Sequence, residues 1–288
     1  HRKIIIRHEY GQLGNILFRL GNSLAYALNF GFRIEDYTLA FCNYHDGSSN
    51  IRFFENYYKL HFFEYPKPKV NLSNRIKWKL RNYRFQKIKK IENFEPSFDL
   101  EDLKTNSSFE LKGFHFSSSE LVAKYHSEIS QILSFRNSII RPINRLIDKT
   151  RSANAVLLGV HIRANDFKKF YKGKYFVQAD RYLEIIDQFK RLKQAGLSIG
   201  VIVCSDCPKV LREIREICPS FIIHHGSVAQ DMQLLSMCDY LLGPKASTFS
   251  AWAAFIGKIP IFQIDQNSKL ESENDFKQVC RLEPFNLT

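Results

Sequence analysis

Three short segments, far apart in the chain, combine residue types that bind phosphate and sugar. They are Gly-Gln-Leu-Gly-Asn at residues 11–15, His-Ile-Arg-Ala-Asn-Asp at 161–166 and Ser-Thr-Phe-Ser at 247–250. Small hydroxyls at the start of a helix, together with its unpaired backbone N–H groups, form a natural seat for a phosphate. An arginine beside such a seat can bind the same anion through its planar guanidinium group. Together, the segments predict a site for a ligand that carries a phosphate.

The elements that must position these segments follow from hydrophobic periodicity. Residues 3–7 predict a short buried strand, and the apolar spacing over 15–30 predicts a helix that ends at Gly31. Beyond residue 150, apolar strands alternate with helices. The strands are predicted at 155–162, 197–204, 221–225, 240–243 and 259–264, and the helices at 179–195, 208–217, 229–237 and 247–256. Such alternation is typical of a doubly wound parallel sheet.

The length of 288 residues suits two domains of ordinary size. We expect an N-terminal α/β domain at residues 1–150 and a C-terminal one at 151–288. Before the boundary, the pattern over 119–135 and 137–149 predicts helices.

Polar residues follow the ends of several predicted strands. His161 and Arg163 end one strand, Ser205 and Asp206 end the next, and the segment 247–250 comes after a third. Ligands of open parallel sheets bind beyond the carboxyl ends of the strands, so we expect these residues to meet at one edge. Taken singly, each motif has a plainer explanation: a tight turn, a structural His–Arg pair or a helix N-cap.

In this order, the segments resemble those of the α1,2-, α1,6- and protein O-fucosyltransferase superfamily, and most nearly its bacterial α1,2 branch. That family's Gly-x-Leu-Gly-Asn-Gln-Leu-Phe pattern corresponds to residues 11–18 here, and its His-x-Arg-Arg-Gly-Asp motif to 161–166. Its Ser-Asp-Asp element corresponds to 205–207, and its Ser-Ser/Thr-Phe-Ser-x-Trp-Ala-Ala helix to 247–254. The resemblance is strong over 156–264, fair over 4–30 and absent over 40–145.

The resemblance implies an α/β protein of the GT-B fold, with two Rossmann-like domains facing across a cleft. The domain at 1–150 would lie on the acceptor side, and the domain at 151–288 would bind a nucleotide-sugar donor, GDP-fucose. The reaction would transfer L-fucose to a hydroxyl of a glycan or glycolipid, with inversion at the anomeric carbon. The resemblance implies no cofactor and no metal.

The resemblance also assigns roles to single residues. Arg163 would hold the β-phosphate and stabilise the leaving diphosphate, and His161 would contact the nucleotide. Asp231 corresponds to a family aspartate that pairs with guanine, although an acid near a helix start can also simply interact with the helix dipole. The other donor-binding residues would be Gly14, Asn15, Ser205, Asp206, Ser247, Thr248, Phe249 and Ser250.

A general base for the acceptor hydroxyl is expected, and the sequence offers two candidates. They are Glu9 and Asp166, and Asp166 also resembles a family residue that orients the arginine. The choice between them stays open.

Two departures from the family pattern leave the donor sugar open. Ala164 stands where the family has a second arginine, and Cys207 stands where it has a second aspartate. A substitute cation could come from one of four nearby lysines, Lys168, Lys169, Lys172 and Lys174. A UDP-sugar donor on the same fold is therefore the alternative enzyme hypothesis.

The net charge of +13 and the pI near 9.4 favour anionic partners. Residues 67–90 contain ten Lys or Arg and no acid, with Trp78, Tyr83 and Phe85 among them. This run suits a solvated or acceptor-facing surface, or peripheral contact with an anionic membrane. Nucleic-acid binding is the weakest of these interpretations. A non-catalytic module that binds polyanions is the alternative from another class of protein.

Six cysteines, four of them in or beside apolar runs, are typical of buried reduced thiols. Cys204 and Cys207 have the spacing of a zinc pair, but only His224 and His225 could complete such a site, so we expect no metal. We expect a cytoplasmic protein, free or peripheral at the membrane, because the cysteines fit reduced thiols and the start of the chain is too short and too quickly polar for a signal peptide. No apolar stretch is long enough to cross a membrane. Since the chain begins without Met, an anchor before His1 stays an open alternative.

Overall fold

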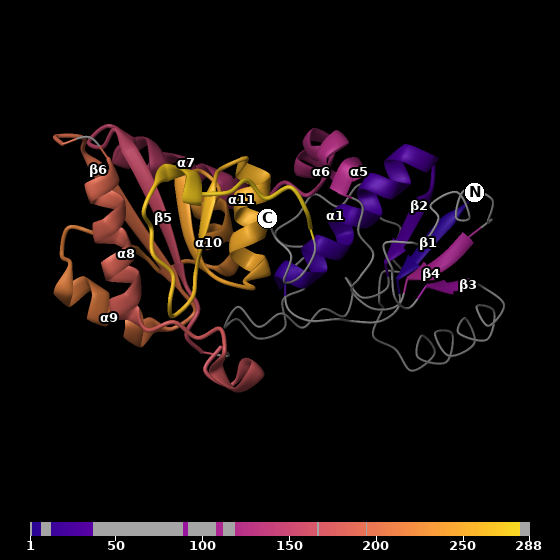
Figure 1. Cartoon of the computed structure of the whole chain (residues 1–288). Helices are drawn as coiled ribbons and strands as arrows, with labels where there is room; N and C mark the ends of the chain where they lie inside the picture. Colours follow the sequence, from indigo (N-terminus) through magenta and orange to yellow (C-terminus); the bar gives the residue numbers. More distant parts are fainter. Residues whose placement is uncertain are drawn as a thin grey trace, which may run out of the picture. The chain divides into compact units, whose positions relative to one another are not determined.

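The computed structural model describes residues 2–6, 13–36, 89–91, 108–111, 119–165, 167–193 and 195–282. The chain divides into two compact units, residues 1–134 and 135–288, which are coloured along the sequence in Figure 1. Each unit is described by itself. The basic residues at 67–88 and the proposed bases Glu9 and Asp166 lie outside the described residues.

The first unit contains a parallel sheet whose strands have the order β2-β1-β4-β3. The strands are β1 (Lys3–Ile6), β2 (Arg33–Asp36), β3 (Lys89–Ile91) and β4 (Ser108–Leu111). Helix α1 (Leu13–Phe30) connects β1 to β2, as the sequence predicts. It ends at Gly31, whose φ of 71° is the left-handed conformation that glycine adopts at low cost.

Two short helices follow, where the sequence predicts one helix over 119–135. They are α5 (Ser119–Lys124) and α6 (His126–Ile132), and both pack against α1. The break is at Tyr125, whose φ of −103° and ψ of 22° are not helical.

The second unit contains a parallel sheet of five strands in the order β7-β6-β5-β8-β9. The strands are β5 (Val156–Ile162), β6 (Ile199–Ser205), β7 (Ile222–His224), β8 (Tyr240–Pro244) and β9 (Ile261–Ile264). The helices are α7 (Asn137–Arg151), α8 (Ala179–Leu192), α9 (Pro208–Ile217), α10 (Val228–Leu235) and α11 (Thr248–Gly257). Two short 3₁₀ helices, η1 (Phe170–Gly173) and η2 (Glu273–Asp275), complete the unit.

Helices cover both faces of this sheet (Figure 1). On one face, Leu158, Val160 and Ile162 of β5 belong to the core that α8 and α9 share. The alternate residues face α10 and α11, since a Cβ on Gly159 would meet Leu235 and one on Gly243 would meet Ser250. The predicted doubly wound α/β architecture of the C-terminal half is therefore present.

The division between the units falls before α7, whereas the sequence predicts a boundary at residue 150. The reason is that α7 packs against α10 and β5 of the second unit. Its buried residues Ile139, Ile143 and Ile147 recur at helical spacing along one side. At its end, Arg151 forms an ion pair of 2.9 Å with Asp239.

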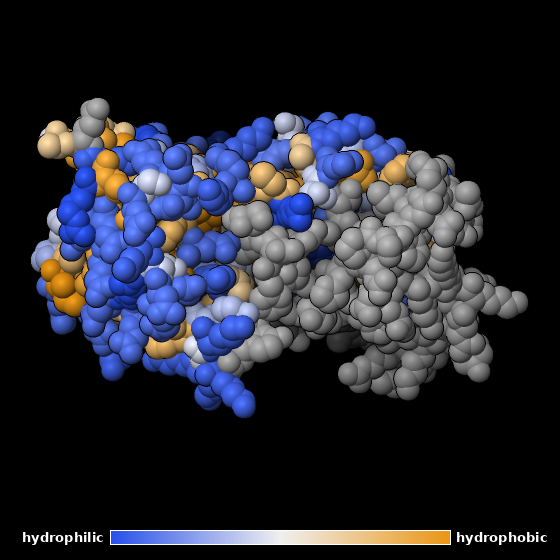
Figure 2. All heavy atoms as spheres, viewed as in Figure 1, coloured by the Kyte–Doolittle hydropathy of each residue, from blue (hydrophilic) through white to orange (hydrophobic). Residues whose placement is uncertain are grey.

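The exposed surface of the second unit is mostly hydrophilic in the view of Figure 2, with small apolar patches. In the described ranges, the exposed large apolar side chains are Leu197 and Ile217. None of the helices described is both long and apolar enough to span a bilayer.

The contact between α10 and α11 gives a stability prediction. A Cβ added at Gly257 would lie 2.1 Å from the carbonyl oxygen of Ser236, so Gly257→Ala should destabilise the protein by about 1–3 kcal/mol. Its neighbour Lys258 has a left-handed φ of 51°, so Lys258→Gly should stabilise the protein by about 1 kcal/mol. Urea unfolding of the two variants tests this, and a neutral Gly257→Ala would contradict the close approach.

Candidate active site

The topology of the second unit creates a switch point between β5 and β8. From β5 the chain proceeds through α8 and α9 to β6 and β7 on one side, and then through α10 to β8 on the other side. Ligands of doubly wound sheets bind at the carboxyl ends of the strands at such a point. His161 lies near the end of β5, and the segment 247–250 follows β8, so both lie at this position.

A chain of hydrogen bonds joins these two strand ends. Nδ1 of His161 lies 2.6 Å from Oγ of Ser250, which lies 3.0 Å from Oγ of Ser247. Because Ser250 donates its hydroxyl proton to Ser247, we assign the proton between His161 and Ser250 to Nδ1 of the imidazole. The start of α11 is thereby tied to the end of β5.

The same serine caps the helix. Oγ of Ser247 accepts from the backbone N–H of Ser250 at 3.3 Å, so Ser247 is the N-cap of α11. Ser250 is fully buried, which makes it a support for His161 and Ser247 rather than a surface that a ligand touches. Phe249 is also buried, and its ring centroid lies 4.7 Å from that of His161.

The helix starts close to β8 because Gly243 has no side chain. A Cβ at Gly243 would lie 2.5 Å from Oγ and 2.6 Å from Cβ of Ser250. Ala246, just before the cap, has a φ of 65°, a left-handed conformation that is costly for alanine. Strained residues of this kind cluster at ligand sites, which is consistent with a site here.

Arg163 follows β5 directly and is half-buried. Its guanidinium carbon lies 4.9 Å from the ring centroid of Phe167, a buried side chain. Stacking on an aromatic face orients the planar guanidinium group. The sequence motifs do not predict this role of Phe167, and the one signal for it is an aromatic residue four positions after the arginine.

Asp206 holds the loop that carries Arg163. Its carboxylate accepts from the backbone N–H of Ala164 at 2.8 Å and from that of Asn165. The side chain of Asn165 donates in return to the carbonyl oxygen of Asp206. Ser205 accepts from the N–H of Cys207 at 3.1 Å and so shapes the turn. Ser205 and Asp206, both predicted as donor-binding, here make contacts that shape the site's loops.

We expect Asp206→Ala to lower kcat/KM about tenfold or more, because a small misplacement of a positioning group is costly. Asp206→Asn keeps a carbonyl oxygen as acceptor and should stay close to the unsubstituted protein. Steady-state kinetics of the two variants tests this. Equal losses in both would contradict a role through the two backbone N–H groups.

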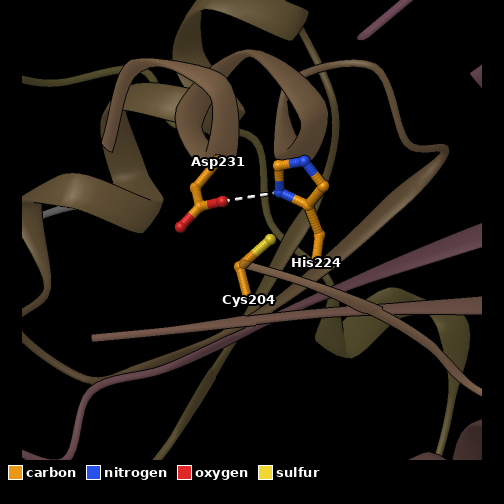
Figure 3. A group of neighbouring side chains, drawn as sticks. All are labelled: Cys204, His224 and Asp231. Atoms are coloured by element: carbon orange, nitrogen blue, oxygen red, sulfur yellow. Dashed lines mark hydrogen bonds and ion pairs between the residues drawn. The ribbon is translucent and has the colours of Figure 1, made fainter. Parts of the chain in front are cut away.

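A second polar cluster lies on the same face of the sheet. His161, Cys204 and His224 are paired in register across β5, β6 and β7, so their side chains share one face. Nδ1–H of His224 donates to Oδ1 of Asp231 at 2.7 Å, as the dashed line in Figure 3 marks. Burial raises the pKa of Asp231, although the hydrogen bonds from His224 and Gly226 act in the opposite direction.

The cysteines are not arranged as the zinc pair, Cys204 and Cys207, that their spacing in the sequence suggests. Cys207 does not join the cluster; the residues that come together are Cys204, His224 and Asp231, whose ligand atoms lie within 4.8 Å of one another. Burial first, and then the charge of Asp231, raise the pKa of the Cys204 thiol well above its usual value. All five described cysteines are outside disulfides.

The remaining predicted residues are in other places. Gly14 and Asn15 lie in the first turn of α1, in the first unit, and Gly11 lies outside the described residues. Of the four lysines that follow Arg163, Lys168 lies over the ring of Phe176 and Lys174 over that of Tyr175, each at 5.4 Å from the centroid.

Solved structures of fucosyltransferases have the same fold. NodZ from Bradyrhizobium matches with a TM-score of 0.58 at 16% identity, over 93% of this chain and 96% of that one. FUT1 from Arabidopsis thaliana, in complex with GDP, matches with a TM-score of 0.58 at 12% identity, over 100% and 76%. POFUT1 in complex with GDP has a TM-score of 0.55 at 13% identity, over 88% and 94%.

These likenesses confirm the predicted α/β fold of the GT-B class. The sequence model of glycosyl transferase family 11 matches residues 35–278. The chain therefore belongs to glycosyl transferase family 11 and, with it, to the fucosyltransferase superfamily that the sequence motifs resemble. It is a glycosyltransferase. Among curated protein sequences, none matches significantly.

Proposed function

We propose that this enzyme transfers L-fucose from GDP-fucose to a hydroxyl of a glycan or glycolipid, with inversion at the anomeric carbon and without a metal. The observation that carries the proposal is the array at the switch point, where His161, Ser250 and Ser247 are hydrogen-bonded and Arg163 follows the same strand. In NodZ, a solved relative of the same fold, crystals were soaked with GDP-fucose or grown with GDP.

The array supports a diphosphate leaving group. As the bond between the sugar and the β-phosphate breaks, negative charge develops on the diphosphate, and preorganised donors stabilise it. The N–H groups at the start of α11, which Ser247 caps, supply such donors, and Arg163 supplies a cation with two parallel N–H groups. The acceptor oxygen attacks the anomeric carbon from the opposite side, and its proton passes to a base.

The base is either Glu9 or Asp166, as the sequence suggests. The cations that replace the family's second arginine would come from the lysines at 168–174. Ala164 itself carries no charge; it is buried, and its N–H donates to Asp206.

A thermal-shift titration with GDP, UDP, GDP-fucose and UDP-sugars, with and without EDTA, tests the donor and the metal independence. We expect stabilisation by GDP and GDP-fucose that survives EDTA. A GDP concentration of about a hundred times its Kd adds roughly 2.7 kcal/mol to the free energy of unfolding. Stabilisation by UDP species alone would overturn the donor, and loss of the shift in EDTA would overturn the metal-free proposal.

A further inference from the structure

One oxygen of the Asp231 carboxylate is occupied by donors from the chain itself. Oδ1 accepts from Nδ1–H of His224 at 2.7 Å and from the backbone N–H of Gly226 at 3.3 Å. Figure 3 shows that the other oxygen turns away from the imidazole. Two donors on one oxygen fix the plane of the carboxylate and leave Oδ2 in a defined direction.

Three separate elements hold this arrangement. Cys204 comes from β6, His224 ends β7, and Asp231 lies in α10, whose start is fixed by a capping box between Ser227 and Gln230. His224 and Asp231 are both largely buried, with exposed side-chain fractions of 17% and 14%. The pair is therefore shielded from bulk water. A pair of this kind exposed to water would contribute little to stability.

The geometry favours a hydrogen-bonded cluster over a metal site. A separation of 2.7 Å between Nδ1 and Oδ1 places a proton between these atoms, so the nitrogen does not offer a lone pair to an ion. The buried thiol of Cys204 is protonated too, because its pKa is raised. As a thiol, it is a weak donor beside the carboxylate.

We propose that His224 is a positioning residue for nucleobase recognition: it holds Asp231 so that Oδ2 accepts from the adjacent N1–H and 2-amino donors of guanine. This inference rests on the proposed function, which supplies the GDP moiety. A fixed carboxylate oxygen that accepts from two adjacent N–H donors distinguishes guanine from bases that lack such a donor pair.

The positioning role has a signature in the pH dependence of binding. Only the ionised carboxylate accepts both bonds, so GDP affinity falls as the pH falls through the pKa of Asp231, which burial raises. The hydrogen bond from His224 lowers that pKa, and removing it shifts the fall in affinity to higher pH. The groups that face Asp231 are Cys204 from β6, together with His224 and His225 at the end of β7. Protonation of His224 keeps its Nδ1–H and so preserves the contact.

The test is the affinity for GDP and for inosine diphosphate, which lacks the 2-amino group, measured by calorimetry between about pH 5 and 8. His224→Leu should weaken GDP binding about tenfold and reduce the preference for GDP over inosine diphosphate. It should also move the acid limb of the binding profile, the fall in GDP affinity at low pH, to higher pH. His224→Asn places an amide N–H near the position of Nδ1–H and should restore all three. His225→Asn, at the exposed neighbour, is the matched control and should leave GDP affinity and base preference unchanged. Because His225 acts on Asp231 by charge alone and less than His224 does, any move of the acid limb should be smaller than in His224→Leu.

The outcomes separate the two proposals. If the unsubstituted enzyme binds no GDP, the proposed donor fails and this inference fails with it. If it binds GDP but His224→Leu does not alter affinity, base preference or acid limb, the positioning role alone is overturned. Equal weakening in His224→Leu and His224→Asn without a shift of the acid limb would also overturn it. So would a stoichiometric zinc ion in the purified enzyme that is lost in His224→Asn.

Discussion

Arg163→Ala should lower kcat/KM for fucosyl transfer about 10²–10³-fold, because it removes one preorganised group from the developing charge of the leaving diphosphate. Folding should be nearly unaffected, since the guanidinium group is half-buried and the ring of Phe167 on which it stacks stays in place. The measurement is the initial rate of GDP release from GDP-fucose with glycan acceptors, alongside the thermal unfolding midpoint.

Two controls sharpen this result. Arg163→Lys keeps the charge but loses the planar guanidinium group, so its rate should lie between those of the unsubstituted enzyme and Arg163→Ala. Arg191→Ala makes the same truncation at an exposed arginine of α8 and should leave the rate unchanged. Full activity in Arg163→Ala would refute the role, and loss of folded protein would reassign Arg163 to the core.

The second half of the fold could be predicted from sequence because its central strands β5, β6 and β8 are buried on both faces. Such strands are continuous apolar runs, separated by amphipathic helices, and the two patterns are easily told apart. Helix α9 has the bounds predicted for it, residues 208–217. Helix α8 ends at Leu192 instead of residue 195 because Lys193 leaves the helix to contact Glu273 at 2.8 Å and the ring of Tyr240.

The division between the units was harder to predict. Helix α7 has an apolar stripe that could pack against either neighbour, and its place depends on α10, which lies about 80 residues later. The break between α5 and α6 at Tyr125 likewise has no glycine or proline beside it that would predict a helix end. Tertiary packing outweighs local propensity at both places.

For the site, the positions of the strand ends in the sequence predict which segments lie close together. They do not predict which atoms form hydrogen bonds. His161, Arg163 and Ser247 belong to ends of neighbouring strands, and this follows from topology. The contact of Ser250 with His161 depends on which face each residue occupies, and a register shift of one residue would reverse it. For the same reason, His224 was considered as a zinc ligand, although it pairs with Asp231.

Gly243→Ala should weaken GDP binding about tenfold or more and destabilise the protein by about 1–3 kcal/mol. The added Cβ would lie 2.5 Å from Oγ and 2.6 Å from Cβ of Ser250, so either α11 or β8 must move. Ser250 cannot turn aside, because it is fully buried and its hydroxyl joins His161 to Ser247. Any movement therefore displaces the N-cap and the imidazole together.

Gly159→Ala is the control that separates the site from general packing. It lies on the same face of the sheet, one strand away, but its Cβ would meet the side chains of Cys238 at 3.0 Å and of Leu235 and Leu241 at 3.2 Å. These side chains can adjust without moving the start of α11, so stability should fall while the Kd for GDP stays unchanged. If Gly243→Ala is destabilised but binds GDP with unaltered affinity, the start of α11 is not the phosphate seat. A selective loss of affinity in Gly243→Ala would instead show that the separation of β8 and α11 sets the geometry of the donor site.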